Sequence, residues 1–424
     1  MNKTFASLKF YNYRLWFIAA IVANIGTWMQ RIAQDWLVLT ELSDDSALAL
    51  GIVTALQFGP ALLLSPWAGL LADRLNRRVF LMISQSVQGL LALGLGVLVL
   101  GGHAQLWQVY IFATALGIIT ALEAPMRQVF VSELVPSKSL PNAVALNAMS
   151  FNTARLIGPA LAGVAIYAIG SGWVFVVNAV SFGATVWALT KLDLSKLVPT
   201  APVERAKGQF REAVSYLRTR HDLLLILFIV AVVSTFTLHY QVTSALMARV
   251  EFGHGASEYG FLGTTIAIGS VAGALHNAKR SHPRVRTIAI ASGLAGLATA
   301  AMAMSPSIEF FAVASVLMGY SMMMILNNAN AAMQTTVEGH LRGRVMSVYM
   351  VVLAGGTPVG ATMVGWISDS VGPRWAIGLG SAAALLAAAG AYVYGRRTWG
   401  IRLRPSVKTA AWITKPTAPA QIPA

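Results

Sequence analysis

Apolar stretches of about 20 residues alternate with short polar stretches along the whole chain. A helix of about 20 apolar residues crosses the hydrocarbon core of a bilayer, so the pattern predicts twelve transmembrane helices. The predicted helices span residues 15–40, 48–71, 79–100, 106–129, 143–168, 173–191, 223–247, 257–278, 286–304, 308–334, 344–367 and 375–395. The expected fold class is therefore an all-α membrane protein with two six-helix halves.

The composition agrees with a membrane protein and argues against several classes of function. Of the 424 residues, 56% are hydrophobic and 11% are charged, which leaves too little polar surface for a soluble domain of this length. The chain has no cysteine, its seven histidines are scattered, and no Gly-Lys pair of a phosphate-binding loop occurs. We expect no metal site, no cofactor and no enzymatic activity, and the energy for any transport must come from a gradient or a partner.

The Lys and Arg residues indicate the orientation of the chain. The net charge of +15 does not indicate nucleic-acid binding, because the cations lie in short loops and form no separate basic domain. Cytoplasmic loops retain Lys and Arg, and placing both termini in the cytoplasm puts most of the 31 cations on that side. The first apolar stretch lacks a small-residue cleavage site, so we read it as a span. The prediction is a multi-pass protein of the cytoplasmic membrane.

One hydrophilic stretch, residues 193–222, divides the chain near its middle. It carries two prolines and an amphipathic basic segment, which indicates a connector on the inner membrane surface. The predicted parts are an N-terminal half (1–192), a cytoplasmic linker (193–222), a C-terminal half (223–396) and a disordered cytoplasmic tail (397–424).

An internal repeat relates the two halves. Ile157–Gly163 aligns without gaps on Val359–Gly365, and Gly170 aligns on Gly372, all at a shift of 202 residues. Two halves with the same helix order predict a pseudo-symmetric bundle, and substrate sites in such folds lie between the halves near the bilayer midplane.

Four short motifs carry a family resemblance. They are GLLADRLNRR at 69–78, APMRQ at 124–128, LPNAVALN at 140–147 and RGRVMS at 342–347. With them the chain resembles the major facilitator superfamily, in the branch that contains enterobactin, macrolide and multidrug exporters. The resemblance implies a twelve-helix alternating-access transporter, with proton-coupled export of a small amphipathic molecule.

The resemblance also assigns roles to two groups of residues. It implies a cytoplasmic latch that ties helix ends together, formed by Gly69, Asp73, Arg74 and Arg77. The second-half counterpart of Asp73 is the neutral Asn277, so we expect the latch in the first half only. The antiporter signature implies a hinge in the fifth span at Gly158, Pro159 and Gly163. Small residues and a proline would permit close packing and a bend, and packing alone is the competing interpretation.

Ionisable residues inside predicted spans are costly and are therefore functional candidates. Asp35 and Arg31 lie one helical turn apart, and we predict that Asp35 binds the coupling proton while Arg31 competes for its charge. A static salt bridge is the alternative. Glu123 and Arg127 form a second pair one turn apart, which either orients the fourth span or makes Glu123 a further proton-coupling candidate. Arg155, also a coupling candidate, needs an intramembrane partner or a substrate anion, and Glu123 is the expected partner. His239 is a weaker proton-coupling candidate, because a lone membrane histidine is more often a packing residue.

Polar and soft apolar residues within the spans indicate a wet, adaptable cavity. Methionine-rich walls suit poorly defined hydrophobic ligands, although ordinary helix packing explains each residue equally well. The candidates are Asn24, Trp28, Gln30, Asn147, Asn152, Phe236, Met323, Asn327 and Asn328.

The predicted function is a secondary exporter, active as a monomer, whose partners are a small amphipathic substrate, protons and the lipid bilayer. A lysophospholipid flippase or an uncoupled carrier of the same fold is the nearest alternative. A membrane-embedded enzyme and a receptor that no longer transports are two further classes. The absent cysteines and dispersed histidines argue against the enzyme, and the intact latch residues argue against the receptor.

Overall fold

The predicted spans are helices in the computed structural model, which describes residues 3–198, 209–278 and 283–399. The first six are α1 (Tyr11–Leu37), α2 (Ala47–Arg74), α3 (Arg77–Leu100), α4 (Leu106–Glu133), α5 (Leu140–Ile169) and α6 (Ser171–Thr190). The helices of the second half are α8 (His221–Phe236), α9 (Tyr240–Leu246), α10 (Ala256–Ala278), α11 (Val285–Ala303), α12 (Ile308–Thr335), α13 (Gly339–Val371) and α14 (Pro373–Trp399). The part of the chain that the structure describes contains no strand, which confirms the all-α class.

Eleven described helices or helix pairs are long and apolar enough to cross a membrane. α10 is not among them, because its Gly, Thr and Ser residues lower its apolar content. Its place in the chain order nevertheless matches the eighth predicted span. The predicted seventh span, 223–247, is wrong as one continuous helix, because it breaks at residues 237–239. The backbone N–H groups of Thr237 and Leu238 both donate to Val233 O there, so the regular pattern of the α-helix ends.

Local capping explains several helix boundaries. Ser46 begins α2 by accepting from Ala49 N at 3.2 Å, and Asn76 begins α3 by accepting from Val79 N at 3.1 Å. Gly170 and Gly372 occupy equivalent positions of the repeat and both have positive φ, +83° and +101°. Each lies where one helix turns sharply into the next, a conformation that favours glycine.

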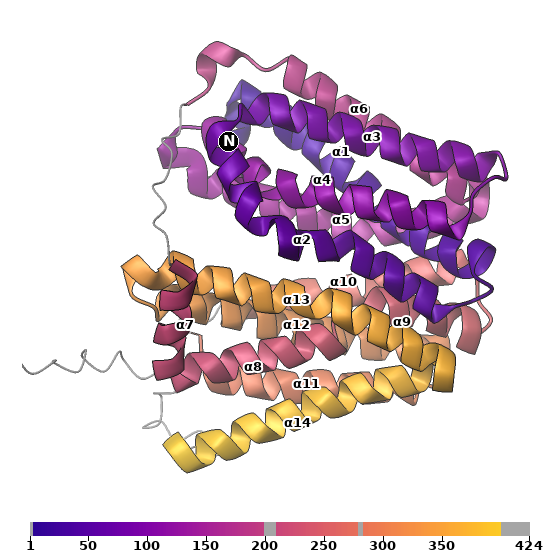
Figure 1. Ribbon diagram of the computed structural model, residues 1–424, viewed down its shortest axis with the longest axis vertical. Helices are drawn as coiled ribbons and strands as arrows, with labels where there is room; N and C mark the ends of the chain where they lie inside the picture. The colour runs from indigo at the N-terminus through magenta and orange to yellow at the C-terminus, as the bar shows by residue number, and fades with distance from the viewer. Residues whose placement is uncertain (1–2, 199–208, 279–282, 400–424) are drawn as a thin grey trace, which may run out of the picture. The chain divides into compact units, whose positions relative to one another are not determined.

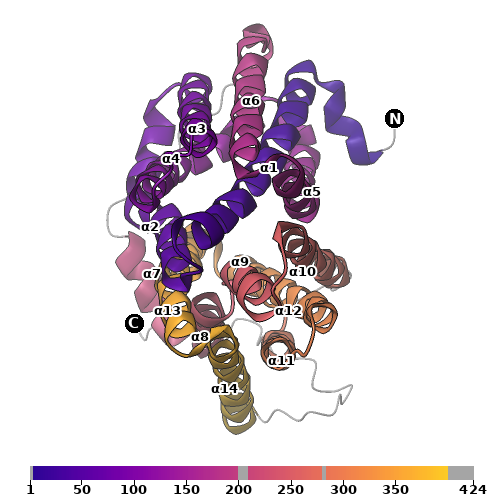
Figure 2. The same ribbon diagram turned by 90° about the vertical axis from the view of Figure 1, so that its right-hand side faces the viewer.

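The described helices group into two compact units. Of the described residues, unit 1 comprises 3–198, 241–264 and 361–369, and unit 2 comprises 209–240, 265–278, 283–360 and 370–399. In unit 1, α1 packs against α5 and α6, α2 against α4, and α3 against α6 (Figure 1). In unit 2, α11 packs against α12 and α14 (Figure 2). Unit 1 therefore includes the first turns of α10 and the last turns of α13, which follow the linker in sequence.

An aromatic cluster closes one end of unit 1. The Trp16 ring meets Phe130 edge-on at 5.4 Å, and Tyr13 donates to Ala143 O at 2.7 Å. These residues come from α1, α4 and α5, and all four are buried. Because lipid is as apolar as these side chains, close packing and hydrogen bonds hold this end together.

The segment that follows α6 is anchored to the start of α1. Asn12 donates to Asp193 O at 2.8 Å and accepts from Asp193 N at 2.9 Å. Bonds from Lys196 and Ser195 hold the pKa of the Asp193 carboxyl at about 2, below its usual range. Within the predicted linker, residues 209–219 form the amphipathic helix α7 (Gln209–Thr219). The division into halves and linker stays a prediction, and the predicted tail lies outside the described residues from position 400 onward.

Candidate coupling site

Helix α1 carries a row of polar residues on one face, and Asp35 is the buried member of the row. Asn24, Thr27, Arg31 and Asp35 follow one another at intervals of three or four residues, which places them on one face of the helix. Asp35 is 6% exposed. A carboxylate with so little exposure in an apolar bundle is a candidate for chemistry.

Asp35 has one hydrogen-bond partner among the described side chains. The Tyr259 hydroxyl of α10 donates to Asp35 Oδ2 at 3.1 Å, and Tyr259 is fully buried. The Tyr259 ring also stacks on Trp36 with the centroids 6.0 Å apart. Sequence reasoning missed Tyr259, because its contact joins residues 224 positions apart and no local pattern indicates it.

Arg31 lies near Asp35 without forming an ion pair within 4 Å. Its guanidinium lies over the rings of Trp28 at 5.1 Å and Phe58 at 5.3 Å. Each cation–π contact contributes about 0.5–2 kcal/mol, depending on desolvation. Arg31 therefore lies one helical turn before Asp35 and contacts these two rings, and the predicted Asp35–Arg31 pair is not an ion pair in this structure.

Arg155 of α5 contacts the same tryptophan as Arg31. Its guanidinium lies 6.0 Å from the Trp28 centroid. The expected pairing of Arg155 with Glu123 is not an ion pair in this structure, because the Glu123 carboxylate is engaged by α3 and α4. Arg31 and Arg155 thus both lie close to Trp28, in the half of α1 that ends with Asp35.

Glu123 lies in a separate polar cluster. Its carboxylate accepts from Ser84 Oγ at 2.9 Å, from Gln85 Nε2 at 2.8 Å and from Gln88 Nε2, and Arg127 Nη1 is 3.6 Å away. All three α3 partners are buried. Three polar residues so close together in an otherwise apolar helix indicate a buried polar contact, but the sequence does not identify the acid that they contact.

A chain of hydrogen bonds extends from this cluster to α5. Arg127 donates to Asn24 Oδ1 at 3.3 Å, and Asn24 donates to Ser150 Oγ at 3.1 Å. The predicted cavity residue Gln30 is buried instead, because Asn178 of α6 donates to its Oε1 at 2.5 Å. Gln34, one turn after Gln30, has a buried Nε2 with no hydrogen-bond partner. Of these α1 residues, Asn24 and Trp28 remain half-buried.

The predicted hinge of α5 packs against both α1 and α10. A Cβ at Gly158 would lie 2.6 Å from Trp28 Cβ, and a Cβ at Gly163 would lie 2.8 Å from Ala256 O. A Cβ at Gly260 would lie 2.5 Å from Pro159 O. We call the contact formed by Pro159, Gly163, Ala256, Gly260 and Gly263 the α5–α10 seam. Only glycine permits backbones to approach this closely.

The repeat produces a second contact of this kind between α13 and α2. A Cβ at Gly365, the counterpart of Gly163, would lie 2.5 Å from Ala47 O. Asp369 follows one turn later and accepts from Ala47 N at 2.6 Å, Leu48 N at 3.0 Å and Ser46 Oγ at 2.9 Å. The carboxylate thus binds the N-terminus of α2, where the helix dipole favours negative charge.

The structure gives partial information on the other predicted residues. In α5, Asn147 is half-buried, whereas Asn152 is exposed and donates to Ala148 O at 2.8 Å. The side chains of Gly69, Asp73 and Arg74 lie outside those that the structure describes. Arg77 forms an ion pair with Glu133 at the start of α3.

Unit 2 contains the remaining candidates. The His239 ring is buried and lies 2.9 Å from Thr235 O, which fits a packing role. Asn328 donates to Asn277 Oδ1 at 2.5 Å, so two predicted polar residues pair with each other. Phe236, Met323 and Asn327 are half-buried and stay candidates for substrate contact.

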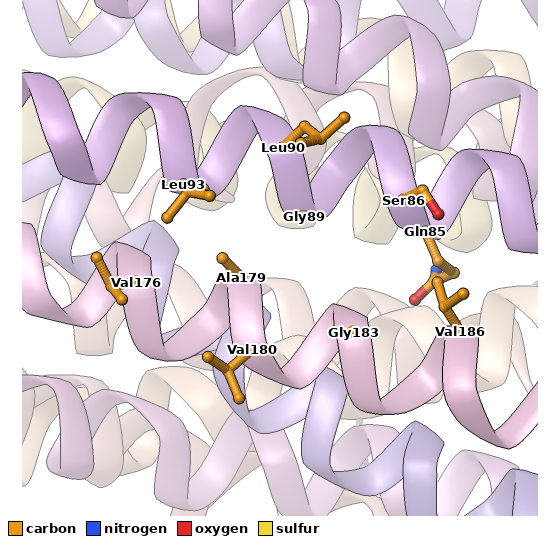
Figure 3. Close-up of a pocket in the computed structure, with 10 residues that line it drawn as sticks. All are labelled: Gln85, Ser86, Gly89, Leu90, Leu93, Val176, Ala179, Val180, Gly183 and Val186. Atoms are coloured by element: carbon orange, nitrogen blue, oxygen red, sulfur yellow. The ribbon is translucent and has the colours of Figure 1, made fainter.

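A surface groove between α3 and α6 is separate from these polar clusters. It has a volume of about 450 Å³, and Figure 3 shows Leu93 and Leu90 of α3 across from Val176 and Val180 of α6. Small residues such as Gly89 and Gly183 make room for it. Its lining is mostly apolar, and Gln85 and Ser86 are its polar residues, so it contains no ionisable group that could exchange a proton.

A bundle of long apolar helices with buried ionisable groups defines a multi-pass membrane transporter. The model of the transmembrane secretion effector family matches residues 2–407, and the chain belongs to this family of the major facilitator superfamily. This finding confirms the resemblance indicated by the sequence motifs.

Two curated relatives and one solved structure show what the chain is similar to. A staphyloferrin A transporter of Staphylococcus aureus is 26% identical, over 85% of this chain and 90% of that protein. A multidrug efflux pump, Tap, of Mycobacterium tuberculosis is 25% identical, over 84% of this chain and 86% of that protein. The solved structure is the crystal structure of a bacterial homologue of the human lysosomal transporter Spinster, in an inward-facing and unoccupied conformation. It aligns with this chain with a TM-score of 0.68 at 16% identity, and the alignment covers 96% of this chain and all of that one. The last comparison concerns the fold alone.

Proposed function

We propose that the protein is a secondary exporter that moves a small amphipathic molecule out of the cytoplasm by alternating access, in exchange for protons bound at Asp35. The single observation that carries the coupling site is the environment of this carboxylate. Asp35 is 6% exposed, has one hydroxyl donor and lies in no ion pair within 4 Å among the described residues. The names of the efflux-pump and staphyloferrin A relatives support a small-molecule substrate.

The coupling follows from the opposing influences on the Asp35 charge. The charge of this carboxylate depends on its burial, on the Tyr259 hydroxyl that donates to it and on Arg31 one turn away. A change in any of the three alters the relative stability of the charged and neutral forms. A substrate that approaches Trp28 or displaces Arg31 would therefore change proton occupancy at Asp35, which is the requirement for exchange.

The test uses purified protein in liposomes that contain a pH-sensitive dye. Lipophilic cations, macrolides, siderophores and lysolipids are added one at a time, and dye response is recorded for the wild type and for Asp35→Asn. We expect one class of compound to trigger proton movement in the wild type. The neutral amide cannot release a proton, so Asp35→Asn should reduce the response to that of empty liposomes.

Asp45→Asn is the matched control. Asp45 is an exposed carboxylate in the turn after α1, and its partner is Arg249 at 3.0 Å. An exposed pair contributes at most about 1 kcal/mol to stability, so this variant should keep the full dye response. Compound transport without proton movement, unchanged in Asp35→Asn, would contradict proton exchange and favour the uncoupled carrier or lysophospholipid flippase.

A further inference from the structure

The first turns of α10 connect the proposed proton site to Pro159 of α5. Tyr259 bonds to Asp35 and stacks on Trp36, both at the end of α1. The next residue, Gly260, lies against the Pro159 carbonyl, and Gly263 lies against the Pro159 ring. One short stretch of helix thus contacts both the carboxylate and the proline of α5.

The α5–α10 seam leaves little freedom for independent movement. Added Cβ atoms at Gly260 and Gly263 would lie 2.5 Å and 2.6 Å from Pro159 atoms, well inside normal contact distance. Backbones packed this closely move together or separate, because packed interfaces have discrete arrangements. A change in the position of Tyr259 is therefore a change at Pro159.

We infer that Tyr259 is the positioning residue through which the charge of Asp35 holds the α5–α10 seam closed. This inference rests on Asp35 being the proton site. A hydroxyl bonded to a carboxylate forms a charge-assisted hydrogen bond, roughly twice as strong as a bond between neutral groups. Protonation of Asp35 removes that extra strength, so the seam opens more readily when Asp35 is neutral.

The other charged groups near Asp35 do not take over this role. Arg31 belongs to α1 itself and lies over Trp28 and Phe58. Arg155 of α5 interacts electrostatically with Arg31. On α10, the Glu258 carboxylate accepts from Gly255 N at 3.1 Å and Ser257 Oγ at 2.9 Å. Tyr259 is the described residue that reaches from α10 to the carboxylate.

The test places a reporter in the seam. Because the chain has no cysteine, Ala256→Cys introduces one thiol at a position that is 7% exposed and whose carbonyl faces Gly163. The labelling rate of this thiol by a small maleimide, measured in liposomes and corrected for thiolate content, reports opening of the seam. A carboxylate that exchanges the coupling proton has to take it up and release it near physiological pH, and protonation weakens its bond to Tyr259. We therefore expect faster labelling at pH 6 than at pH 8.

Tyr259→Phe removes the hydroxyl and keeps the ring that stacks on Trp36. In this variant we expect the labelling rate at pH 8 to rise by about tenfold, which is the ratio that corresponds to losing a hydrogen bond to a charged group. We also expect the labelling rate to become independent of pH. Tyr13→Phe is the control, since it removes another buried tyrosine hydroxyl of unit 1, bonded to Ala143 O at 2.7 Å. Its labelling should match the parent at both pH values.

Two outcomes separate the inference from the function on which it rests. If Asp35→Asn loses the pH dependence of labelling while Tyr259→Phe keeps it, Asp35 controls the seam without Tyr259 and the inference is wrong. If Asp35→Asn keeps substrate-triggered proton movement in the dye assay, the proposed coupling site itself is wrong. Loss of pH dependence in both variants, with Tyr13→Phe unchanged, supports the relay through Tyr259.

Discussion

Two buried carboxylates in unit 1 differ in the number of groups that hold them. Glu123 accepts from three α3 side chains and lies 3.6 Å from Arg127, whereas Asp35 has Tyr259 alone as a hydrogen-bond donor. A carboxylate with several donors is a structural element, because neutralising it would leave those donors facing one another. A carboxylate with one donor can exchange its proton at a lower cost.

Glu123→Gln tests this distinction at the level of one residue. The amide has about the same shape, but its NH2 group meets the amide groups of Gln85 and Gln88, which now donate to the carboxylate. We expect the free energy of unfolding to fall by roughly 1–3 kcal/mol, measured by thermal unfolding in detergent. Substrate-triggered proton movement should persist in the folded fraction.

A matched control separates this effect from loss of charge alone. Asp45→Asn neutralises an exposed carboxylate and should change stability by less than about 1 kcal/mol. If Glu123→Gln were as stable as the wild type but lost proton movement, Glu123 would be a coupling residue rather than a structural one.

The sequence could identify these acids but could not distinguish their roles. Asp35 and Glu123 both stand in apolar stretches, each with an arginine one turn away on the same helix. The two acids differ in their partners from other helices. Gln85 and Ser84, which bond to Glu123, are 38 and 39 residues from it in the sequence, and Tyr259, which bonds to Asp35, is 224 residues from it. Such partners depend on how the helices pack, which hydropathy does not specify. Arg155 is a further example, because Glu123, its expected partner, is already bonded to side chains of α3 and lies beside Arg127.

At the scale of helices, the internal repeat produces two related close contacts with different chemistry. Gly163 packs α5 against α10, and its counterpart Gly365 packs α13 against α2. Asp369 binds the N-terminus of α2. The equivalent position of the first half is Tyr167, which is 83% exposed. One contact is therefore capped by a carboxylate, and the other is adjacent to the Asp35–Tyr259 bond.

Gly365→Ala tests how far the α2–α13 contact depends on close approach. The new methyl group would lie 2.5 Å from Ala47 O, so α2 must move away and its bonds to Asp369 must lengthen. We expect a loss of about 1–3 kcal/mol in stability, the usual cost of inserting a methyl group into a packed site. Thermal unfolding of the purified variant measures it.

Gly378→Ala is the matched control for this substitution. A Cβ at Gly378, in the first half of α14, meets no atom within 4 Å. Alanine should therefore stabilise the helix by up to about 1 kcal/mol through its better helix propensity. Equal effects of the two substitutions would show that helix propensity, and not the contact with Ala47, governs position 365.

The helices themselves could be predicted from the apolar pattern because each span needs about 20 apolar residues. The turns at Gly170 and Gly372 also agree with the sequence, because both glycines lie between predicted spans and align in the repeat, and the structure gives both a positive φ. The break between Phe236 and Tyr240 could not be predicted, because apolar residues continue on both sides of it. Hydropathy measures burial in lipid and contains little information on where a backbone hydrogen-bond pattern ends.

At the scale of the whole molecule, the distribution of Lys and Arg predicts a direction of insertion. Cations flank or occupy three connections, whereas the α3–α4 connection contains no Lys or Arg: Arg74, Arg77 and Arg78 lie beside the α2–α3 connection, Lys138 lies in the α4–α5 connection, and Arg284 and Arg286 lie at the start of α11. Cytoplasmic loops retain Lys and Arg during insertion, so the first group should face the cytoplasm and the α3–α4 turn should face outward. The direction matters for function, because export requires that the proposed proton exchange run inward while substrate runs outward.

Two single-cysteine variants test this topology in intact cells, with the cysteine-free parent as the background. His103→Cys places a thiol in the exposed α3–α4 turn, and Ser137→Cys places one in the exposed α4–α5 connection, next to Lys138. A membrane-impermeant maleimide should label position 103 in intact cells and position 137 only after permeabilisation. The reverse pattern would invert the topology. Because the two sites lie at opposite ends of α4, labelling of both in intact cells would mean that α4 does not cross the membrane at all.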